Sequence, residues 1–245
     1  MAMDFSKVKS LTIPEGSVSK ITISNNIVWK KPDENPYNVL PYLVAVQSSN
    51  AYIDLGIPYQ IGCIAEYKIT LKGTANVFGV FYTTQMCRSY ITNNTAYFNV
   101  GTSVSSTAYT QIANLVNGTD YIITVQADPG TPSALISIGD NIDEYNPIPE
   151  DWLAWDSSPY NMYLFSVHRQ TPPADGTRII HYFKYWDSNG ELLLDLVPVE
   201  RKSDGVLGML NNVNGQFLTN IADGTFYKEI PANTSDYVVD DIDII

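Results

Sequence analysis

Residues 193–220, LLDLVPVERKSDGVLGMLNNVNGQFLTN, decide the fold of this chain. The stretch contains the turn pairs Asp204-Gly205 and Asn214-Gly215, and glycine readily adopts the positive φ that tight hairpin turns require. The stretch therefore predicts consecutive antiparallel strands joined by hairpin turns. The apolar side chains that we expect to fill the faces between these turns are Leu196, Val197, Val199, Val206, Leu207 and Phe217.

A polar group, residues 200–204 (ERKSD), precedes the first turn. It has two interpretations: an ion-pair or turn-capping network that holds the hairpin, or a set of ligand contacts. We favour the first interpretation. The residues that we assign to the fold motif are Asp195, Arg201, Ser203, Asp204, Gly205, Asn214 and Gly215.

Short β-rich runs separated by turns extend back from this stretch to Tyr42. Residues 66–71 (EYKITL) and 121–126 (YIITVQ) show the period-two pattern of strands with one wet face. No segment has the pattern of a long amphipathic helix. This spacing predicts an all-β sandwich. The strands that we expect are residues 51–55, 64–71, 77–82, 96–100, 121–126, 134–138, 162–168, 178–186, 192–199 and 215–219.

The stretch 193–220, with the Gly224-Thr225-Phe226 that follows, resembles the closing strands of concanavalin A-like, LamG-type jelly rolls found in phage and gut-bacterial proteins. Residues 51–58 (AYIDLGIP) resemble the opening strand of the same family. The resemblance covers about residues 40–228, with the strand pattern alone supporting the middle. It implies a concanavalin A-like jelly-roll β-sandwich.

Residues 1–31 precede this domain and contain three expected short strands, 8–13, 18–23 and 27–29, with one apolar side. Three strands of this length cannot close a core by themselves, so the apolar side must dock on something. Part of this region also looks like the short leaders of phage structural proteins. We therefore expect residues 1–31 to form a β-rich segment that attaches to other virion proteins.

The remaining boundaries follow from composition. Residues 32–39 are polar and contain two prolines, which predicts a semi-rigid linker. We expect residues 40–230 to form the jelly roll. Residues 231–245 alternate acidic and β-branched side chains. This acidic tail is either mobile or pairs as a strand with a neighbouring subunit, and we favour pairing because its apolar side chains are costly to expose.

The formal net charge of −12 would repel a phosphate backbone, so we expect no nucleic-acid partner. The start of the chain has no basic residues followed by an apolar run, and no stretch is long and apolar enough to span a membrane. We expect synthesis in the bacterial host cytoplasm and, from the resemblance, a place on the virion surface.

Cys63 and Cys87 cannot supply a disulfide framework or a four-ligand zinc site. They form either a single disulfide or two buried thiols, and we favour two buried thiols. His168 and His181 belong to no metal-binding spacing. The Asp-rich spacing of a calcium loop is also missing. We therefore predict no metal and no cofactor.

Between Gly139 and Tyr160 the sequence predicts a long irregular stretch, and a loop of that length is usually functional or covers part of the core. Aromatic faces with nearby polar groups suit sugar binding. Alternatively, the two tryptophans cap the core from outside. The candidate sugar-binding residues are Tyr145, Trp152, Trp155, Tyr160, Asp156 and Asn161.

No nucleophile elbow, phosphate-binding loop or zinc-hydrolase motif occurs, so we expect no enzyme. The rival is a glycoside hydrolase, which needs two carboxylates beside the scissile bond. Its candidate acids, which we expect to be solvated turn residues, are Asp140, Asp143, Glu144, Glu150 and Asp151.

The function that we expect is a virion structural protein, a capsid decoration or a head or tail fibre component, that adheres to host-surface glycans. Many copies on one particle would add weak contacts by avidity. A homo-oligomer is expected, and a trimer by analogy with other fibre proteins. The alternative from another class is an architectural capsid-cementing protein without a ligand.

Overall fold

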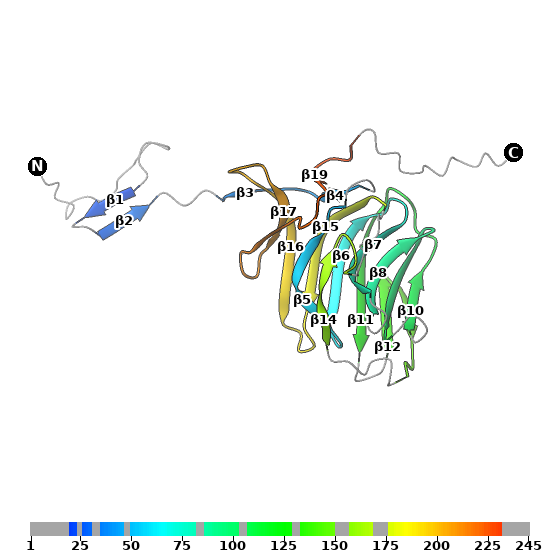
Figure 1. Cartoon of the computed structure of the whole chain (residues 1–245). Coiled ribbons are helices and arrows are strands. Elements are labelled where there is room, and N and C mark those ends of the chain that lie inside the picture. Colours follow the sequence, from blue (N-terminus) through cyan, green and yellow to red (C-terminus); the bar gives the residue numbers. More distant parts are fainter. Residues whose placement is uncertain are drawn as a thin grey trace, which may run out of the picture. The chain divides into compact units, whose positions relative to one another are not determined.

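The computed structural model describes residues 20–23, 26–30, 35–46, 50–81, 86–102, 107–128, 133–149, 157–168 and 176–231. The chain divides into two compact units, residues 1–36 and residues 37–245. In the first unit, β1 (Lys20–Ile23) and β2 (Asn26–Lys30) pair antiparallel, with a register shift after Ile21 (Figure 1). The strand expected over residues 8–13 lies outside the described residues, as does the tail beyond residue 231.

The second unit is built from strands, which confirms the all-β class. These are β3 (Tyr37–Val39), β4 (Leu43–Ala45), β5 (Ile53–Gln60), β6 (Ile64–Thr70), β7 (Ala75–Phe81), β8 (Met86–Thr92), β9 (Thr95–Gly101), β10 (Thr107–Ile112), β11 (Asp120–Asp128), β12 (Ser133–Ile138), β13 (Asn141–Tyr145), β14 (Ser157–Leu164), β15 (Arg178–Trp186), β16 (Leu192–Arg201), β17 (Leu207–Asn211), β18 (Phe217–Thr219) and β19 (Phe226–Tyr227).

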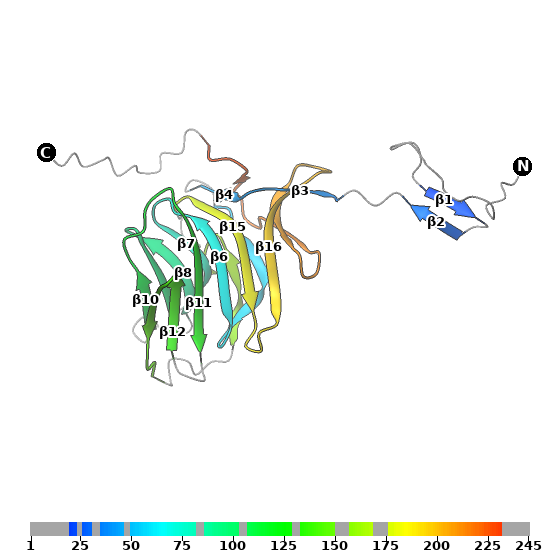
Figure 2. The ribbon, with the colours of Figure 1, turned by 180° about the vertical axis from the view of Figure 1, so that it is seen from behind.

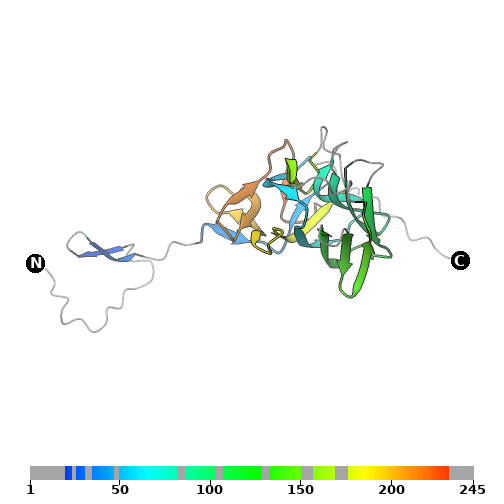
Figure 3. The ribbon, with the colours of Figure 1, turned by 90° about the horizontal axis from the view of Figure 1, so that it is seen from below.

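The strands form two antiparallel sheets, seen from opposite sides in Figures 1 and 2 and along the strands in Figure 3. The small sheet has six strands in the order β10-β9-β8-β7-β14-β5. The large sheet has eleven strands, with the main path β13-β12-β11-β6-β15-β16-β17-β18 and with β3, β4 and β19 added beside it. Two stacked antiparallel sheets of this kind make the jelly-roll sandwich that the sequence predicts.

Strands β8 and β10 were not expected, and further details also differ from the expectation. Residues 141–145 form strand β13, and β14 begins at Ser157, so the irregular stretch is shorter than expected. β13 lies at a sheet edge and is mostly exposed, so its sequence lacks the apolar alternation of a half-buried strand. β14 ends at Leu164 because Phe165 has a φ of 68°. β3 pairs with β16, so residues 37–39 belong to the second unit rather than to a free linker.

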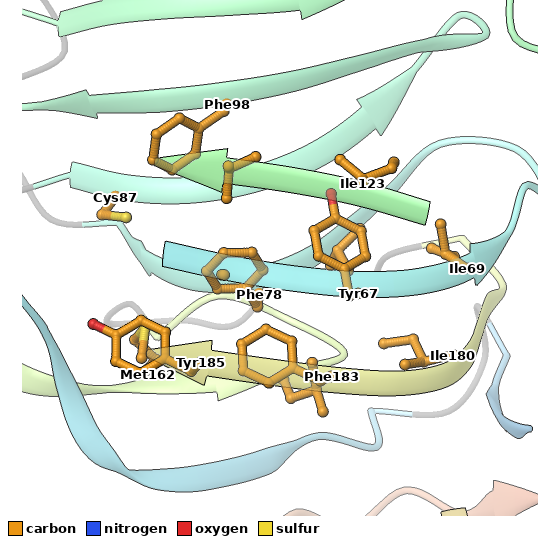
Figure 4. Close-up of a cluster of buried hydrophobic side chains, with 14 of the residues drawn as sticks. Tyr67, Ile69, Phe78, Cys87, Phe98, Ile123, Met162, Ile180, Phe183 and Tyr185 are labelled. Atoms are coloured by element: carbon orange, nitrogen blue, oxygen red, sulfur yellow. The ribbon is translucent and has the colours of Figure 1, made fainter. Parts of the chain in front are cut away.

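The core lies between the two sheets, and Figure 4 shows side chains from both sheets pointing toward one another. Phe78 of β7 packs edge-on against Tyr67 of β6 and Phe183 of β15, with ring centroids 5.7 and 5.1 Å apart. The Tyr67 hydroxyl also lies 2.5 Å from Ser89 Oγ in β8. Ser89 donates its own proton to the Tyr97 carbonyl, so Tyr67 acts as the donor between the sheets.

Both cysteines are unbonded and buried, as expected. Burial raises the pKa of the Cys63 thiol and of the Cys87 thiol. Tyr59 and Tyr185 lie beside them in the core, with ring centroids 6.2 Å apart. A thiol held protonated in such surroundings behaves as a small apolar side chain.

Residues 193–220 form most of β16, all of β17 and β18, and the turns between these strands. Gly205 and Gly215 have φ values of 71° and 75°, as hairpin turns require. Arg201 donates to Asp204 at 2.7 Å, and Asp204 Oδ1 accepts the Val206 backbone N–H at 3.2 Å. At the second turn, Asn214 Oδ1 accepts a hydrogen bond from the Gln216 backbone N–H. Beside this turn, the Asp195 carboxylate accepts a hydrogen bond from Asn212 Nδ2.

The end of this motif closes onto the opening strand of the domain. Asn220 Oδ1 accepts the backbone N–H groups of Tyr52 and Ala222 at 3.0 and 3.1 Å. Its Nδ2 donates to the carbonyls of Ala222 and Gly224 at 2.7 and 2.6 Å. A Cβ atom on Gly224 would lie 2.4 Å from the Ala51 backbone nitrogen. The two segments that carry the family resemblance are therefore neighbours in space, joined by one asparagine side chain.

Candidate functional site

The structure does not gather the described candidate sugar-binding residues into one loop. Tyr145 ends β13 of the large sheet, whereas Tyr160 and Asn161 lie in β14 of the small sheet. Trp152, Trp155 and Asp156 lie outside the described residues. The interpretation that the tryptophans cap the core therefore also stays a prediction.

Tyr160 and Asn161 support the small sheet rather than standing apart from it. Asn161 Nδ2 donates to Asp54 in the neighbouring strand β5 at 3.4 Å. The Asn161 carbonyl accepts a hydrogen bond from His168 Nδ1 at 2.7 Å. The Tyr160 ring packs edge-on against the His168 ring, with centroids 5.4 Å apart.

The candidate acids of a hydrolase are placed as follows. Asp143 Oδ2 accepts the backbone N–H of Gln111 at 2.7 Å and so links the edge strands of the two sheets. Glu144 accepts from Asn146 Nδ2 at 3.4 Å. Glu150 and Asp151 lie outside the described residues. Among the described residues, no group of three His, Cys, Asp or Glu side chains is arranged to hold a metal ion.

The outer face of the large sheet is charged and its groups bond to one another. Lys68 lies 2.7 Å from Asp120, which also accepts a hydrogen bond from Thr70 at 2.6 Å. These hydrogen bonds, that from Lys68 above all, lower the pKa of Asp120. His181 donates from Nδ1 to the Pro41 carbonyl, and its Nε2 lies 2.8 Å from Thr70 Oγ1.

Burial lowers the pKa of His181, and the charge of Asp120 opposes this effect. Nearby on the same face, Tyr182 donates to Glu66 at 3.1 Å. Burial, followed by the Glu66 charge, raises the pKa of Tyr182 to about 12. The outer face of the large sheet is therefore a solvated surface whose charged groups stabilise one another.

The outer face of the small sheet has a different character. The strand register places one residue of each strand in a single row across the sheet: Asp54, Tyr163, Gly79, Arg88, Asn99 and Tyr109. A second row beside it contains Tyr90, Tyr97 and Gln111. We call the outward residues of this sheet the tyrosine face: Tyr52, Phe81, Arg88, Tyr90, Tyr97, Asn99, Tyr109 and Tyr163.

Four side chains of the tyrosine face form a continuous stack, which we call the β8 stack. The Arg88 guanidinium lies between the rings of Phe81 and Tyr90, 4.4 and 4.2 Å from their centroids. Tyr90 stacks in turn on Tyr97, with centroids 4.9 Å apart and planes within 8°. Because each member is held by the next, the stack is ordered before any ligand arrives.

Polar groups and an exposed ring lie beside the β8 stack. Tyr109 on the edge strand β10 is 55% exposed, and Asn99 lies between it and Arg88 in the row. Burial raises the pKa of the Tyr90 hydroxyl, and the Arg88 charge acts against this. The phenol hydroxyls can donate and accept hydrogen bonds, and the guanidinium can donate them, next to apolar ring surface, whereas the Asn99 side chain is buried.

A second group of rings, the β14 stack, lies at the other side of the tyrosine face. Tyr163 stacks on Tyr52 with centroids 4.6 Å apart, and on His168 with centroids 4.1 Å apart and planes within 4°. His168 is held there by its hydrogen bond to the Asn161 carbonyl and by a backbone bridge to Val80. The two stacks place outward aromatic groups on both halves of the small sheet.

Sequence reasoning missed Arg88 and Tyr90 of the β8 stack because β8 was not expected as a strand, although Phe81 and Tyr97 lie within strands that were expected. The signal was present: Arg88 and Tyr90, and Tyr97 and Asn99, occupy alternate positions between buried neighbours. That alternation would have put them on one outward face. What it could not provide is the pairing of strands that puts these positions side by side.

No family model matches the chain, and no curated protein matches its sequence. The fold is similar to that of a heptameric SAP-like pentraxin from Limulus polyphemus, with a TM-score of 0.51 and 8% identity over 81% of this chain and 99% of that one. The CBM40 domain of the Ruminococcus gnavus IT-sialidase, bound to α2,6-sialyllactose, matches with a TM-score of 0.41 and 14% identity, covering 59% of this chain and 89% of that one.

The pentraxin comparison supports the jelly-roll fold. In the part of the chain that the structure describes, no helix is long and apolar enough to cross a membrane.

Proposed function

We propose that this protein binds glycans through the tyrosine face. The observation that carries the proposal is the contrast between the two outer faces of the sandwich. The large sheet covers its outer face with charges that bond to one another, such as Lys68 and Asp120. The small sheet instead presents ordered aromatic side chains with Arg88 among them.

Sugars present both apolar C–H surface and many hydroxyls. A face that combines aromatic rings with donors and acceptors matches both properties. The face is also largely preformed, because stacking holds Arg88 and Tyr90 in place. A preformed face loses little conformational entropy on binding, so weak contacts suffice when many copies act together.

The test uses the full chain immobilised at high density on beads and probed with an array of bacterial and host glycans. We expect binding by the wild type and a loss of about tenfold or more for Tyr97→Ala and Tyr109→Ala. Tyr145→Ala is the matched control, because Tyr145 is 38% exposed but belongs to the large sheet. Absence of binding to any glycan, or an equal loss in the control, would reject the proposal.

We further propose that this lectin-like domain is displayed on a virion, as a capsid decoration or a head or tail fibre. The support is the resemblance of residues 193–226 and the β-rich first unit. In this proposal the chain is made in the host cytoplasm, and residues 1–31 attach it to other virion proteins. The jelly-roll domain then lies on the virion surface. By analogy with fibre proteins, we propose that the chain forms a trimer.

Cross-linking mass spectrometry on purified particles tests this setting. We expect cross-links from the lysines of residues 1–31 to another virion protein, and absence of the chain from particles would reject the setting. Stabilised particles without glycan binding would favour a cementing protein instead. Release of reducing sugar ends from host polysaccharide would favour a glycoside hydrolase.

A further inference from the structure

Every strand of the small sheet is accompanied by an outward aromatic side chain. Tyr52 immediately precedes β5, Tyr163 lies in β14 and Phe81 ends β7. The remaining three are Tyr90 in β8, Tyr97 in β9 and Tyr109 in β10. The rings therefore form a track that crosses all six strands, rather than a cluster at one end of the sheet.

The length of this track follows from the strand order. Tyr163 and Tyr109 lie in the same row and are separated by four strand spacings, which amount to about 19 Å. Tyr52, on the side of β5, extends the track further. This span exceeds a single pyranose ring and also a disaccharide.

Polar groups lie along this row and the row beside it. Asp54 lies at the β5 end of the row and Arg88 near its middle, next to the buried Asn99, and Gln111 on β10 lies in the second row. A site for one terminal sugar brings a few polar groups together around a single point. Here hydrogen-bonding groups and rings repeat from strand to strand, which is the arrangement that a repeating ligand requires.

We infer that the tyrosine face binds the interior of a linear oligosaccharide chain laid across the strands, rather than the terminal sugar of a branched glycan. The inference rests on the proposed glycan-binding function. The β8 stack with Tyr109 binds one part of the chain, and the β14 stack binds another. Affinity then grows with chain length until both stacks are occupied, because each added contact is made within one complex.

The experiment measures affinity for ladders of one to eight sugars prepared from amylose, cellulose, chitin and galactan, using the full chain and isothermal titration. We expect a steep rise in affinity between two and about five sugars, followed by a plateau, as estimated from the span of the row. For the longest ligands, Tyr163→Ala and Tyr109→Ala should each weaken binding by about tenfold. Tyr145→Ala is again the control.

The decisive readout is the dependence of each loss on ligand length. Tyr163→Ala should weaken the binding of ligands of five or more sugars by a larger factor than the binding of one or two sugars, because only the longer ligands reach both stacks. Tyr52→Ala, whose backbone contact with Asn220 is kept, provides a second variant at the same end in case Tyr163→Ala lowers stability. Circular dichroism melts identify any variant that is not folded.

The outcomes separate this inference from the proposed function. Equal affinity for one sugar and for eight would overturn it, as would equal losses on short and long ligands in both β14-end variants. Binding only to branched array glycans through Tyr97 and Tyr109 would overturn it while the proposed function stands. No binding to any ladder or array glycan would reject both.

Discussion

Removal of the Asn220 side chain tests how the domain is closed. Asn220→Ala deletes four hydrogen bonds, to the backbone of Tyr52, Ala222 and Gly224. A typical hydrogen bond contributes about 0.5–1.5 kcal/mol net, and water recovers part of this at the half-exposed loop. We therefore expect a loss of about 2–3 kcal/mol in the free energy of unfolding, estimated from that range.

Urea denaturation followed by circular dichroism measures this loss. At an m-value of about 2–3 kcal/mol/M, the midpoint should fall by about 1 M with little change in m. The matched control is Asn212→Ala, which deletes one exposed hydrogen bond to Asp195 and should cost less than about 0.5 kcal/mol. A midpoint for Asn220→Ala within error of the wild type, or equal losses in the two variants, would refute the closing role of Asn220.

Three other outcomes follow from the structure. Asp143→Ala should lower stability by about 1–2 kcal/mol, because the Gln111 N–H loses a charged acceptor, and calorimetry showing no change would contradict the link between the sheet edges. Folding lowers the pKa of His181 and the pKa of Asp120, so the unfolded chain takes up each proton first as the pH drops. The free energy of unfolding should therefore fall as the pH drops below 6.5, the ordinary pKa of histidine, and again below 3.8, the ordinary pKa of aspartate. Melting curves of His181→Gln should lack the first of these two steps. Both cysteines should resist a thiol reagent in the native protein and react in denaturant, because burial raises their pKa values; rapid native labelling would argue against the packing described.

Much of the fold could be predicted from sequence because its signals are local. The turns at Gly205 and Gly215 and the alternation in residues 121–126 depend only on neighbouring residues. β13 escaped prediction because an exposed edge strand needs no apolar face. The unexpected start of β14 follows from the same absence of a local pattern in the stretch before it.

The candidate site could be predicted only in part. Sequence reasoning looked for aromatic residues close together along the chain and so selected a stretch that included Tyr145 and Tyr160. The structure assigns these two residues to different sheets. The rings of Tyr90, Tyr97 and Tyr163 belong to three strands, and no spacing along the chain links them.

The sequence by itself determined the all-β class, most of the strands and the hairpin turns within residues 193–226, because a period of two and a glycine at a turn act within a few residues. Tertiary structure alone decided which outward side chains share a face. Register and strand order bring Tyr163, Arg88 and Tyr109 into one row from distant parts of the chain. That choice depends on the packing of two sheets around one core, which no short stretch of sequence encodes.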